Sequence, residues 1–443
     1  MNIWDRFLDF ESKQHLFDLK DKEGTCVWDI VRFYIYINLL WDYSTVSKPL
    51  KKKKNYLQYF KNVYKWISCC FTKKDYLFFL CSRNVLNNCY FDKNAENILD
   101  IIDHKNMIII ETYDIEFSKL GYKSKHILGL LPFSFISKLF VHKHYNFQPI
   151  LELINEEFKT NNITIDYLDN LYRIFYIQKW FYSHFLRKWG IKKVFLTQNG
   201  IQKGLLAACR DLGITSLEFQ HGIVDKGHLA YSYPHQTSYE NCYVPDKILS
   251  FSDFWFNDCI IPSTEIIPIG NDYFTISPSS QLSQENNKNI LVISADIFGE
   301  ELSSFILSCL KKSFWKDYTF YFKLHPNQFF EYQKYYHKFE KYSNVVVMTN
   351  ESDVPSLIDK TQYMLTIQST AVYEALQKGN RVFLLKRNSY KRQEHIFKYK
   401  NVDLIDNEME FEEKISSNFI IKQNSTPQFF VPFNFEIAKN IIS

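Results

Sequence analysis

The sequence lacks the common motifs that hold nucleotides or metals. Its 443 residues contain no G-x-x-x-x-G-K-[ST], no G-x-G-x-x-G, no H-E-x-x-H and no D-x-D. ATP hydrolysis at a P-loop, a standard dinucleotide site and a zincin site are therefore unsupported. A transferase that holds its nucleotide through a divalent metal is disfavoured too, because paired carboxylates would have to hold that metal. We expect no metal and no cofactor.

Cysteine pairs and an excess of one charge are also missing. The nine Cys form no C-x-x-C, which argues against a zinc ribbon or a disulfide framework and favours a reducing compartment. The 53 basic residues are nearly balanced by 49 acidic ones, and only nine are Arg, so nucleic acid is not an expected partner. Asp5, Arg6, Asp9 and Glu11 stand where a signal peptide needs an apolar stretch. We expect a cytoplasmic protein.

Apolar residues, in contrast, are plentiful. They make up 46% of the chain, and short apolar runs recur between amphipathic stretches, which is typical of parallel strands covered by helices on both faces. We therefore predict an α/β fold with two independent domains. Strands are expected at 76–81, 107–110, 194–197, 216–219, 243–251, 265–270, 290–293, 319–324, 344–348, 363–367 and 381–385, and helices at 300–312 and 370–378.

Composition also predicts where the domains end. Residues 277–289 are polar and carry a single Leu, so we interpret them as a linker. An N-terminal domain over 1–276 would precede it, and a C-terminal domain over 290–425 would follow. We expect the closing segment 426–443 to pack back on the N-terminal domain.

Polar side chains follow the strand predicted at 319–324. Ligands of doubly wound sheets bind beyond the carboxyl ends of the strands, so His325 would project toward a ligand. Pro326 disfavours helical geometry at His325 and fixes the turn that aims it. His325 could donate to a phosphate oxygen, with Lys323 adding charge. The alternative is a helix-start turn in which His325 only satisfies backbone groups.

A second polar group follows the strand predicted at 363–367. Gln368, Ser369 and Thr370 open a helix, whose first N–H groups and dipole favour an anion. Glu374 lies one turn further on and could accept the two hydroxyls of a ribose. The alternative is an ordinary Ser/Thr cap.

The first half has one comparable motif, after the strand predicted at 216–219. His221 is suited to remove a proton from an attacking hydroxyl, and Gly222 permits close approach of a ligand. Gln220 would line the acceptor side. The loop that follows is polar, and it offers Asp225 and His228 as alternative bases or acceptor contacts. A His221 that only orders the turn is the other interpretation.

Three weaker features keep two interpretations each. Asn199 and Gly200 either line the acceptor side or belong to an ordinary turn. The basic loop 386–392 either assists a leaving diphosphate or is a solvated loop. The lysines at 48 and 51–54 precede an aromatic stretch, and they form either a surface loop or a peripheral contact with the inner face of the cell membrane.

Four motifs in this order resemble a known group of enzymes. They are QHG at 220–222, GND at 270–272, KLHPNQ at 323–328 and QSTAVYEAL at 368–376. Together they resemble the bacterial GT-B glycosyltransferases of capsule, lipopolysaccharide and related surface glycans. The HP and S-[ST] pair is similar to that of sialyltransferases and Kdo transferases. The H-G and H-P combination is similar to that of CDP-glycerol glycerophosphotransferases. The resemblance covers roughly residues 190–385.

The resemblance implies two Rossmann-like domains that face each other across a cleft, with the nucleotide-sugar donor on the second and a glycan or lipid-linked glycan acceptor on the first. His325, Ser369 and Thr370 would bind donor phosphate, Glu374 would bind the ribose, and His221 would be the base. Metal-independent, inverting transfer to a hydroxyl follows. The D/E-D/E-G motif of sialyltransferases is absent, which argues against sialic acid as the sugar.

Three other functions fit the same motifs. The first is a CDP-polyol phosphotransferase, and the second is a sugar-nucleotide 2-epimerase, which the sequence favours less because no paired carboxylates and His are evident. The third is a non-catalytic subunit that binds a sugar nucleotide.

Overall fold

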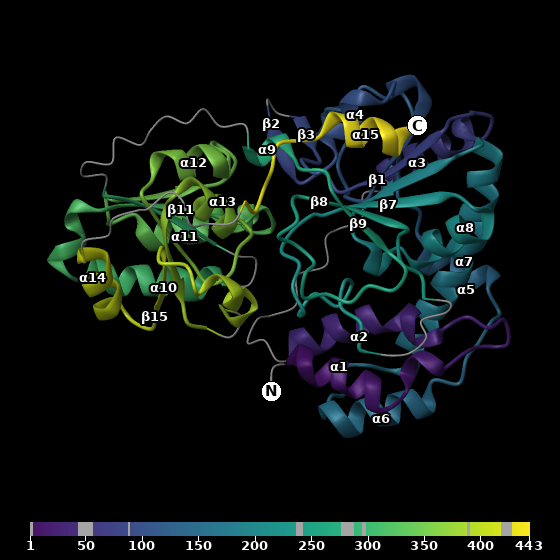
Figure 1. Ribbon diagram of the computed structural model, residues 1–443, viewed down its shortest axis with the longest axis horizontal. Coiled ribbons are helices and arrows are strands. Elements are labelled where there is room, and N and C mark those ends of the chain that lie inside the picture. Colours follow the sequence, from purple (N-terminus) through teal and green to yellow (C-terminus); the bar gives the residue numbers. More distant parts are fainter. Residues whose placement is uncertain are drawn as a thin grey trace. The chain divides into compact units, whose positions relative to one another are not determined.

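The chain folds into two compact units in a computed structural model (Figure 1), which describes residues 3–42, 56–86, 89–235, 242–275, 288–294, 298–387, 390–417 and 428–443. Unit 1 comprises Met1–Ile269 and Phe433–Ser443, and unit 2 comprises Gly270–Pro432. Most of the predicted linker 277–289 lies outside the described residues, as do the lysines at 48 and 51–54.

Unit 1 is built on a seven-stranded sheet in the order β5-β4-β1-β6-β7-β8-β9, in which every neighbouring pair is parallel. The inner strands are apolar and buried on both faces, as the sequence predicted. In β1, Leu77 and Phe79 face one core, and Phe78 and Leu80 face another. The strands are β1 (Tyr76–Leu80), β4 (Met107–Glu111), β5 (Ile127–Gly129), β6 (Lys193–Leu196), β7 (Thr215–Phe219), β8 (Lys247–Ser250) and β9 (Glu265–Pro268). A separate antiparallel pair joins β2 (Asn84–Leu86) to β3 (Cys89–Phe91).

Helices cover both faces of the unit 1 sheet. The longest, α7 (Ile165–Trp189), begins where Thr164 Oγ1 accepts a hydrogen bond from the Tyr167 N–H, and it ends at Gly190, whose φ is 74°. Figure 1 shows α1, α2 and α6 gathered on one side of the unit. The helices are α1 (Ile3–Lys13), α2 (Val27–Asp42), α3 (Tyr56–Cys69), α4 (Glu96–Ile101), α5 (Phe133–Phe140), α6 (Gln148–Phe158), α7, α8 (Lys203–Leu212) and α15 (Phe435–Ile442).

The C-terminal helix α15 belongs to unit 1, so the chain returns to this unit after unit 2. Figure 1 shows it in yellow beside α4. Phe433 and Ala438 are buried in the same apolar cluster as Ile98 of α4. Lys193 Nζ donates to the carbonyls of Ile441 and Ile442 at 2.6 and 2.8 Å, which ties the last turn of α15 to β6.

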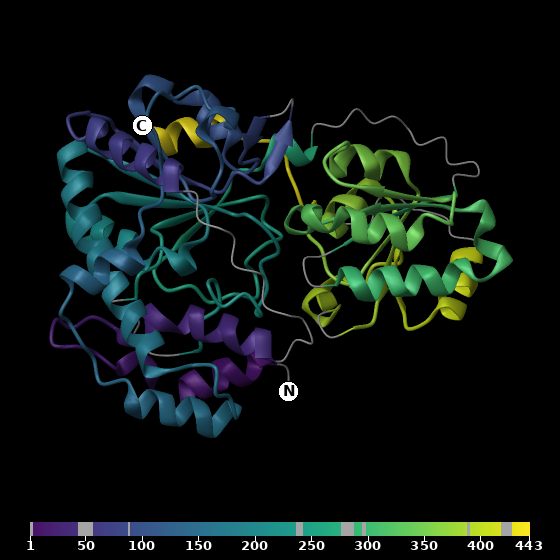
Figure 2. The same ribbon diagram turned by 180° about the vertical axis from the view of Figure 1, so that it is seen from behind.

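Unit 2 has a six-stranded parallel sheet in the order β12-β11-β10-β13-β14-β15. Figure 2 shows helices on both of its faces. The strands are β10 (Asn289–Ile293), β11 (Thr319–Lys323), β12 (Val345–Met348), β13 (Tyr363–Thr366), β14 (Arg381–Leu385) and β15 (Val402–Ile405). The helices are α9 (Asp272–Thr275), α10 (Gly299–Leu310), α11 (Tyr332–Phe339), α12 (Val354–Lys360), α13 (Ala371–Lys378) and α14 (Glu408–Ser416).

Two edge strands, β5 and β15, were not expected from the sequence. β5 is only three residues long, and β15 carries Asp403 inside the strand. Asp403 is accommodated because Arg381 of β14 donates to it at 2.7 Å. In the part of the chain that the structure describes, no helix is long and apolar enough to cross a membrane.

Candidate functional site

In unit 1, His221 lies just beyond the carboxyl end of β7 in a chain of hydrogen bonds. Its Nδ1 is 3.2 Å from the Tyr231 hydroxyl oxygen, and that hydroxyl donates to Glu218 Oε1 at 2.6 Å. Glu218 is fully buried in β7. Its carboxylate also accepts the backbone N–H groups of Gln198 and Asn199. A buried carboxylate thus orients a tyrosine, and the tyrosine contacts the histidine.

These hydrogen bonds determine which ring nitrogen of His221 carries a hydrogen. Tyr231 has one hydroxyl hydrogen, and it donates that hydrogen to Glu218. At the contact with His221 the Tyr231 oxygen must therefore accept, so Nδ1 of His221 carries the hydrogen. The neutral ring then presents Nε2 with a free lone pair. That tautomer is the one a general base needs.

The pKa of His221 supports a neutral ring. Burial, and secondarily the positive guanidinium of Arg83, lower that pKa to about 4. At neutral pH the imidazole is therefore uncharged. The structure thus puts Arg83, which follows β1, close to the predicted base.

The loop after β7 brings His228 to His221. The two rings lie 5.8 Å apart, edge to face, and His228 lies 4.6 Å from the Tyr231 ring. Asp225 takes part through its backbone carbonyl, which accepts from the His228 N–H at 3.0 Å and from Ser232 Oγ at 3.2 Å. The predicted candidates therefore form one cluster with Tyr231 at its centre.

A buried ion pair in α1 and α2 holds this loop. Arg32 donates to both carboxylate oxygens of Glu11 at 2.6 and 2.8 Å. The same guanidinium donates to the carbonyls of Leu229 and Ser232 at 2.5 and 2.9 Å. The backbone on both sides of Tyr231 is thereby fixed to the helical layer.

The four residues predicted on the acceptor side have mostly internal contacts. Asn199 Nδ2 donates to Glu218 Oε2 at 2.7 Å, so Asn199 supports the carboxylate. A Cβ at Gly200 would lie 2.7 Å from the Phe33 ring, so this glycine allows close packing against α2. Gln220 Oε1 accepts the Phe251 N–H at 2.9 Å, and its Nε2 donates to the carbonyl of Gly222 at 3.0 Å.

In unit 2, His325 caps the 3-10 helix Pro326–Glu331 that follows β11. Its Nδ1 accepts the Asn327 N–H at 3.2 Å, and Gln328 Oε1 accepts the His325 N–H at 3.3 Å. Because Nδ1 accepts, a neutral His325 carries its hydrogen on Nε2. The capping turn expected as the alternative is present, and it leaves His325 as a donor through Nε2–H. His325 and His221 thus have opposite tautomers.

Lys323 is used inside unit 2. Its ammonium group donates to the carbonyls of Thr349 and Ser352, the latter at 2.8 Å. Burial lowers the pKa of this amine, although Glu351 and Asp353 oppose the effect. Two of its three N–H groups therefore donate to the loop after β12.

The second predicted donor motif opens α13. Ser369 Oγ accepts the Ala371 N–H at 3.2 Å, and Ser369 is held by buried Gln393, which contacts both its N–H and its carbonyl. Gln368 and Thr370 flank it at the carboxyl end of β13, with Thr370 at the N-cap position. Glu374 is buried one turn further on, and its charge helps to raise the pKa of Tyr273 in α9, after burial itself. The structure thus brings Glu374 near Tyr273, the residue that follows the GND segment, within unit 2.

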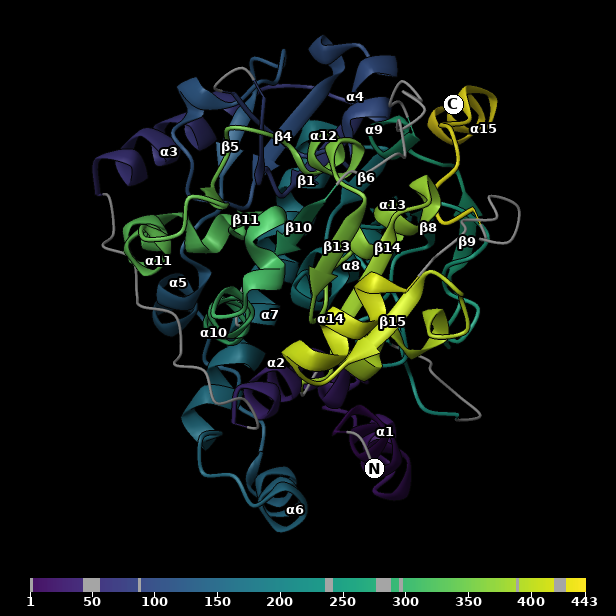
Figure 3. The ribbon, with the colours of Figure 1, turned by 90° about the vertical axis from the view of Figure 1, so that its left-hand side faces the viewer.

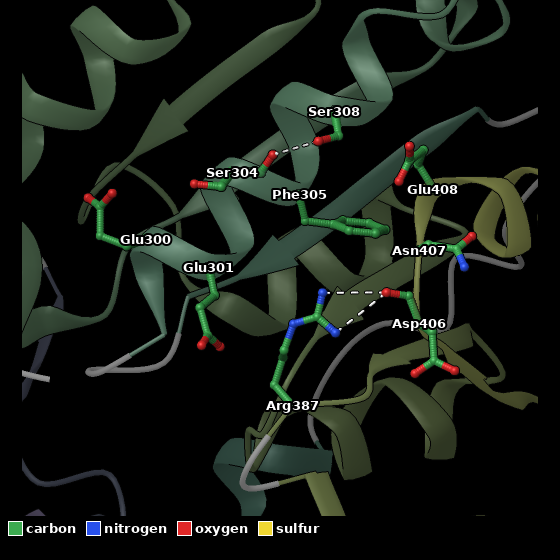
Figure 4. A pocket seen from close by; sticks show the side chains of 9 residues that line it. All are labelled: Glu300, Glu301, Ser304, Phe305, Ser308, Arg387, Asp406, Asn407 and Glu408. Carbon is green, nitrogen blue, oxygen red and sulfur yellow. Dashed lines mark hydrogen bonds between the residues drawn. The ribbon is translucent and has the colours of Figure 1, made fainter. Parts of the chain in front are cut away.

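A cavity of about 480 Å³ lies at the carboxyl edge of the unit 2 sheet (Figure 4). It is lined by Glu300, Glu301, Ser304, Phe305, Ser308, Arg387, Asp406, Asn407 and Glu408. The lining holds four carboxylates and one guanidinium, and Arg387 donates to the carbonyls of Lys386 and Asp406. Lys386 pairs with the Asp406 carboxylate at 2.6 Å. Lys386 is therefore neutralised here, and the four carboxylates make this cavity unfavourable for a phosphate.

No metal centre is evident in the described ranges, where no group of three or more His, Cys, Asp or Glu side chains could hold an ion.

Two important residues, Glu218 and Tyr231, were given no role from the sequence. Glu218 could have been found, because a carboxylate inside the apolar strand SLEF must be paired when it is buried. Tyr231 gave no such signal, since its contact with Glu218 and His221 depends on how the loop folds back over β7.

Comparison with known proteins defines the fold. No protein-family model matches the sequence, and no curated protein matches it. Among solved structures, the UDP-GlcNAc 2-epimerase of Methanocaldococcus jannaschii in complex with UDP-GlcNAc and UDP is similar at a TM-score of 0.50 and 11% identity, over 83% of this chain and 98% of that chain. MurG of Acinetobacter baumannii has a TM-score of 0.45 and 7% identity, over 77% and 89%. UGT2 of Phytolacca americana, complexed with UDP-2fluoro-glucose and pterostilbene, has a TM-score of 0.38 and 9% identity, over 73% and 83%. The predicted α/β class, with two parallel-sheet Rossmann-like units of the GT-B type, is confirmed.

Proposed function

We propose that this chain is a glycosyltransferase that moves a sugar from a nucleotide-activated donor to a hydroxyl of a growing bacterial surface glycan. The acceptor is a free or lipid-linked glycan. The reaction is metal-independent and inverts the anomeric carbon. Its resemblance to surface-glycan transferases in the QHG, HP and S-[ST] motifs supports this proposal, as does the confirmed fold class.

The observation that carries the proposal is the pair of opposite histidine tautomers. His221 offers an Nε2 lone pair because Tyr231 and Glu218 fix its hydrogen on Nδ1. His325 offers an Nε2–H because its Nδ1 accepts a backbone N–H. A transfer to a hydroxyl needs one group that accepts a proton and another that donates to a departing phosphate. The two histidines are fixed in the forms that suit these two roles.

The proposed step is a single displacement. The acceptor oxygen attacks the anomeric carbon and its proton passes to His221 Nε2, while the bond from that carbon to the donor phosphate breaks. His325 and the N-terminal end of α13 at Ser369 and Thr370 stabilise the departing phosphate, and Glu374 binds the ribose. Removing one such phosphate contact costs about 2 to 4 kcal/mol in the transition state, or about 10² to 10³ in rate.

A nucleotide screen tests the donor half of the proposal. Thermal unfolding is followed with CMP, CDP, UDP, GDP and dTDP, because a ligand at 100 times its Kd adds about 2.7 kcal/mol of stability. We expect one nucleotide to raise the melting temperature. His325→Ala should abolish most of this shift, and His221→Ala should retain it.

The product identifies the reaction. Given the matching nucleotide sugar and an acceptor panel, mass spectrometry should find a glycosyl increment on the acceptor with the unaltered protein. His221→Ala should lose it, and treatment with EDTA should not. A phosphoryl-polyol increment would instead identify a CDP-polyol phosphotransferase. Conversion of the donor without any acceptor would identify an epimerase, and nucleotide binding without turnover would identify a binding subunit.

A further inference from the structure

Unit 1 exposes an unusual number of large apolar side chains on α3, on α5 and on the turn after α3. They are Tyr64 (71% exposed), Ile67 (61%), Phe71 (88%), Phe135 (64%), Leu139 (55%) and Phe140 (70%). Single exposed apolar residues are ordinary on soluble proteins, but a group of this size marks an interaction surface. We call these six residues the apolar patch.

The helices that carry the patch are joined by a shared aromatic core. Trp66 of α3 and Phe133 of α5 both pack edge to face on Phe181 of α7, at 5.1 and 5.4 Å between ring centroids. Their opposite faces are therefore turned outward on one side of unit 1. Figures 1 and 3 show α3 and α5 along this same side. Trp180, the neighbour of Phe181 on α7, is 66% exposed and continues the aromatic surface.

The sequence segments that build this surface contain no acidic residue. Residues 56–74, 117–151 and 170–210 carry four, five and eight Lys or Arg, respectively, and no Asp or Glu. The chain as a whole is almost balanced, with 53 basic and 49 acidic residues. Some of these cations pair with carboxylates outside the three segments, as Lys179 does with Asp211 and Lys192 with Asp75, so only the unpaired ones can serve an external partner.

Several of these cations stand beside the apolar side chains. Lys188 Nζ of α7 lies 4.9 Å from the centre of the Phe71 ring. Lys61 lies on α3, three residues before Tyr64, and Lys138 lies on α5 next to Leu139, both exposed. Within the described part of the chain, none of these three lysines forms an ion pair with a carboxylate. They are available to an external anion.

We propose that this surface is a peripheral membrane contact that binds an anionic lipid bilayer. Aromatic and aliphatic side chains on amphipathic helices insert at the level of the lipid headgroups, and lysines around them attract anionic headgroups. A protein partner with an acidic face would need carboxylates placed against particular lysines. A bilayer needs only apolar side chains with lysines near them, and α3, α5 and α7 carry both.

Co-sedimentation with vesicles tests the proposal on the full chain, without any substrate. We expect the protein to sediment with phosphatidylcholine vesicles that contain phosphatidylglycerol and to stay largely in solution with phosphatidylcholine alone. Binding should weaken when salt is raised from about 0.1 M to about 0.5 M, because screening shortens the reach of the charges.

Variants separate the apolar and the charged contributions. The triple variant Tyr64→Ser, Ile67→Ser, Phe71→Ser should lower the vesicle partition coefficient at least tenfold, as should Phe135→Ser with Phe140→Ser. Lys61→Gln and Lys138→Gln should each lower it by about fivefold. Phe330→Ser and Lys341→Gln are matched controls, since both residues are exposed in unit 2, and they should leave it unchanged.

The side chains that are changed are exposed, so unaltered melting temperatures should accompany the loss of binding. Failure to sediment with anionic vesicles would overturn the proposal, and so would binding that the patch variants retain. A dimer in sedimentation velocity that the patch variants dissociate, without vesicle binding, would overturn it in favour of a second copy of the chain. None of these results depends on sugar transfer, so the membrane contact and the proposed activity are tested independently of each other.

Discussion

At the scale of single residues, hydrogen-bond partners decide what a histidine can do. His221 and His325 both follow a parallel strand, yet their Nδ1 atoms have opposite roles. Nδ1 donates a hydrogen bond in His221 and accepts one in His325. The partner is a tyrosine in one case and a backbone N–H in the other. A side chain's chemistry is therefore set by neighbours that a sequence motif does not include.

Glu111 gives a residue-scale prediction about stability. It lies at the carboxyl end of β4, and burial raises its pKa to about 7, although Ser82 and the Tyr113 N–H oppose the shift. The folded chain therefore binds a proton that the unfolded chain releases near pH 4.5. The stability from this group is complete below that pH, and it is lost as the pH rises through 7.

Glu111→Gln, which resembles the protonated carboxyl, should remove this loss. Between pH 5 and pH 8 the unaltered protein should lose on the order of 3 kcal/mol more of its free energy of unfolding than the variant does. Denaturant unfolding at several pH values measures the difference. The control is Glu116→Gln, an exposed change on the same loop that should follow the unaltered protein. Parallel pH profiles for Glu111→Gln and the unaltered protein would show that Glu111 stays ionised.

Some of these residue-scale features could be predicted from the sequence, and others could not. The turn at His325 was predictable, because Pro326 and Gln328 are its chain neighbours and make the cap local. The tautomer of His221 was not, because it depends on Tyr231, ten residues away in a loop without regular structure. Nor could the sequence predict the contacts of Lys323. We expected it to add charge beside a phosphate, but its ammonium group donates to the carbonyls of Thr349 and Ser352.

At the scale of elements, the central parallel strands were predicted well and the first helices were not. Apolar runs such as YLFFL form strands because both faces of the sheet are covered. The role of α1 and α2 is invisible in their own periodicity. It lies in Arg32 and Glu11, a buried ion pair whose remaining hydrogen bonds reach a loop about two hundred residues further along the chain.

Arg32→Lys tests whether these helices hold the loop of His221. Lysine cannot reproduce the two-pronged contact with Glu11 together with the bonds to Leu229 and Ser232. We expect a loss of about 3 kcal/mol of stability, since buried acceptors that the guanidinium satisfied are left without a hydrogen bond. The rate of transfer should fall as well, because Tyr231 is no longer fixed.

The matched control for Arg32→Lys is Arg6→Lys. Arg6 forms the same kind of contact with Glu157 at 2.6 Å, but both side chains are more than a third exposed. Its replacement should cost less than about 1 kcal/mol and leave transfer unchanged. If Arg32→Lys behaves like this control in thermal unfolding, the ion pair does not hold the loop.

At the scale of the whole molecule, the chain enters unit 2 once and returns once. The entry is at Gly270, whose φ is 77° and where a Cβ would lie 2.3 Å from the carbonyl oxygen of Pro432 on the returning segment. Only glycine fits a backbone approach this close. The sequence led us to expect that the closing segment 426–443 packs back on the N-terminal domain. It gave no sign that the segment runs against Gly270, because that contact joins residues more than 160 positions apart.

Deleting residues 433–443 should therefore destabilise unit 1, although the deletion follows unit 2 in the sequence. Phe433 and Ala438 are buried against α4, and Ile437 and Ile441 pack on the same cluster, so their loss exposes the sheet face that α15 covers. Burying a large apolar side chain contributes about 1.5 to 3 kcal/mol, so the unfolding free energy of unit 1 should fall by at least about 3 kcal/mol. Scanning calorimetry should show the unit 1 transition at a lower temperature and the unit 2 transition in place. Glu436→Ala, an exposed change on α15, should shift neither transition. A lowered unit 2 transition beside an unchanged unit 1 transition would mean that the final helix supports the other unit.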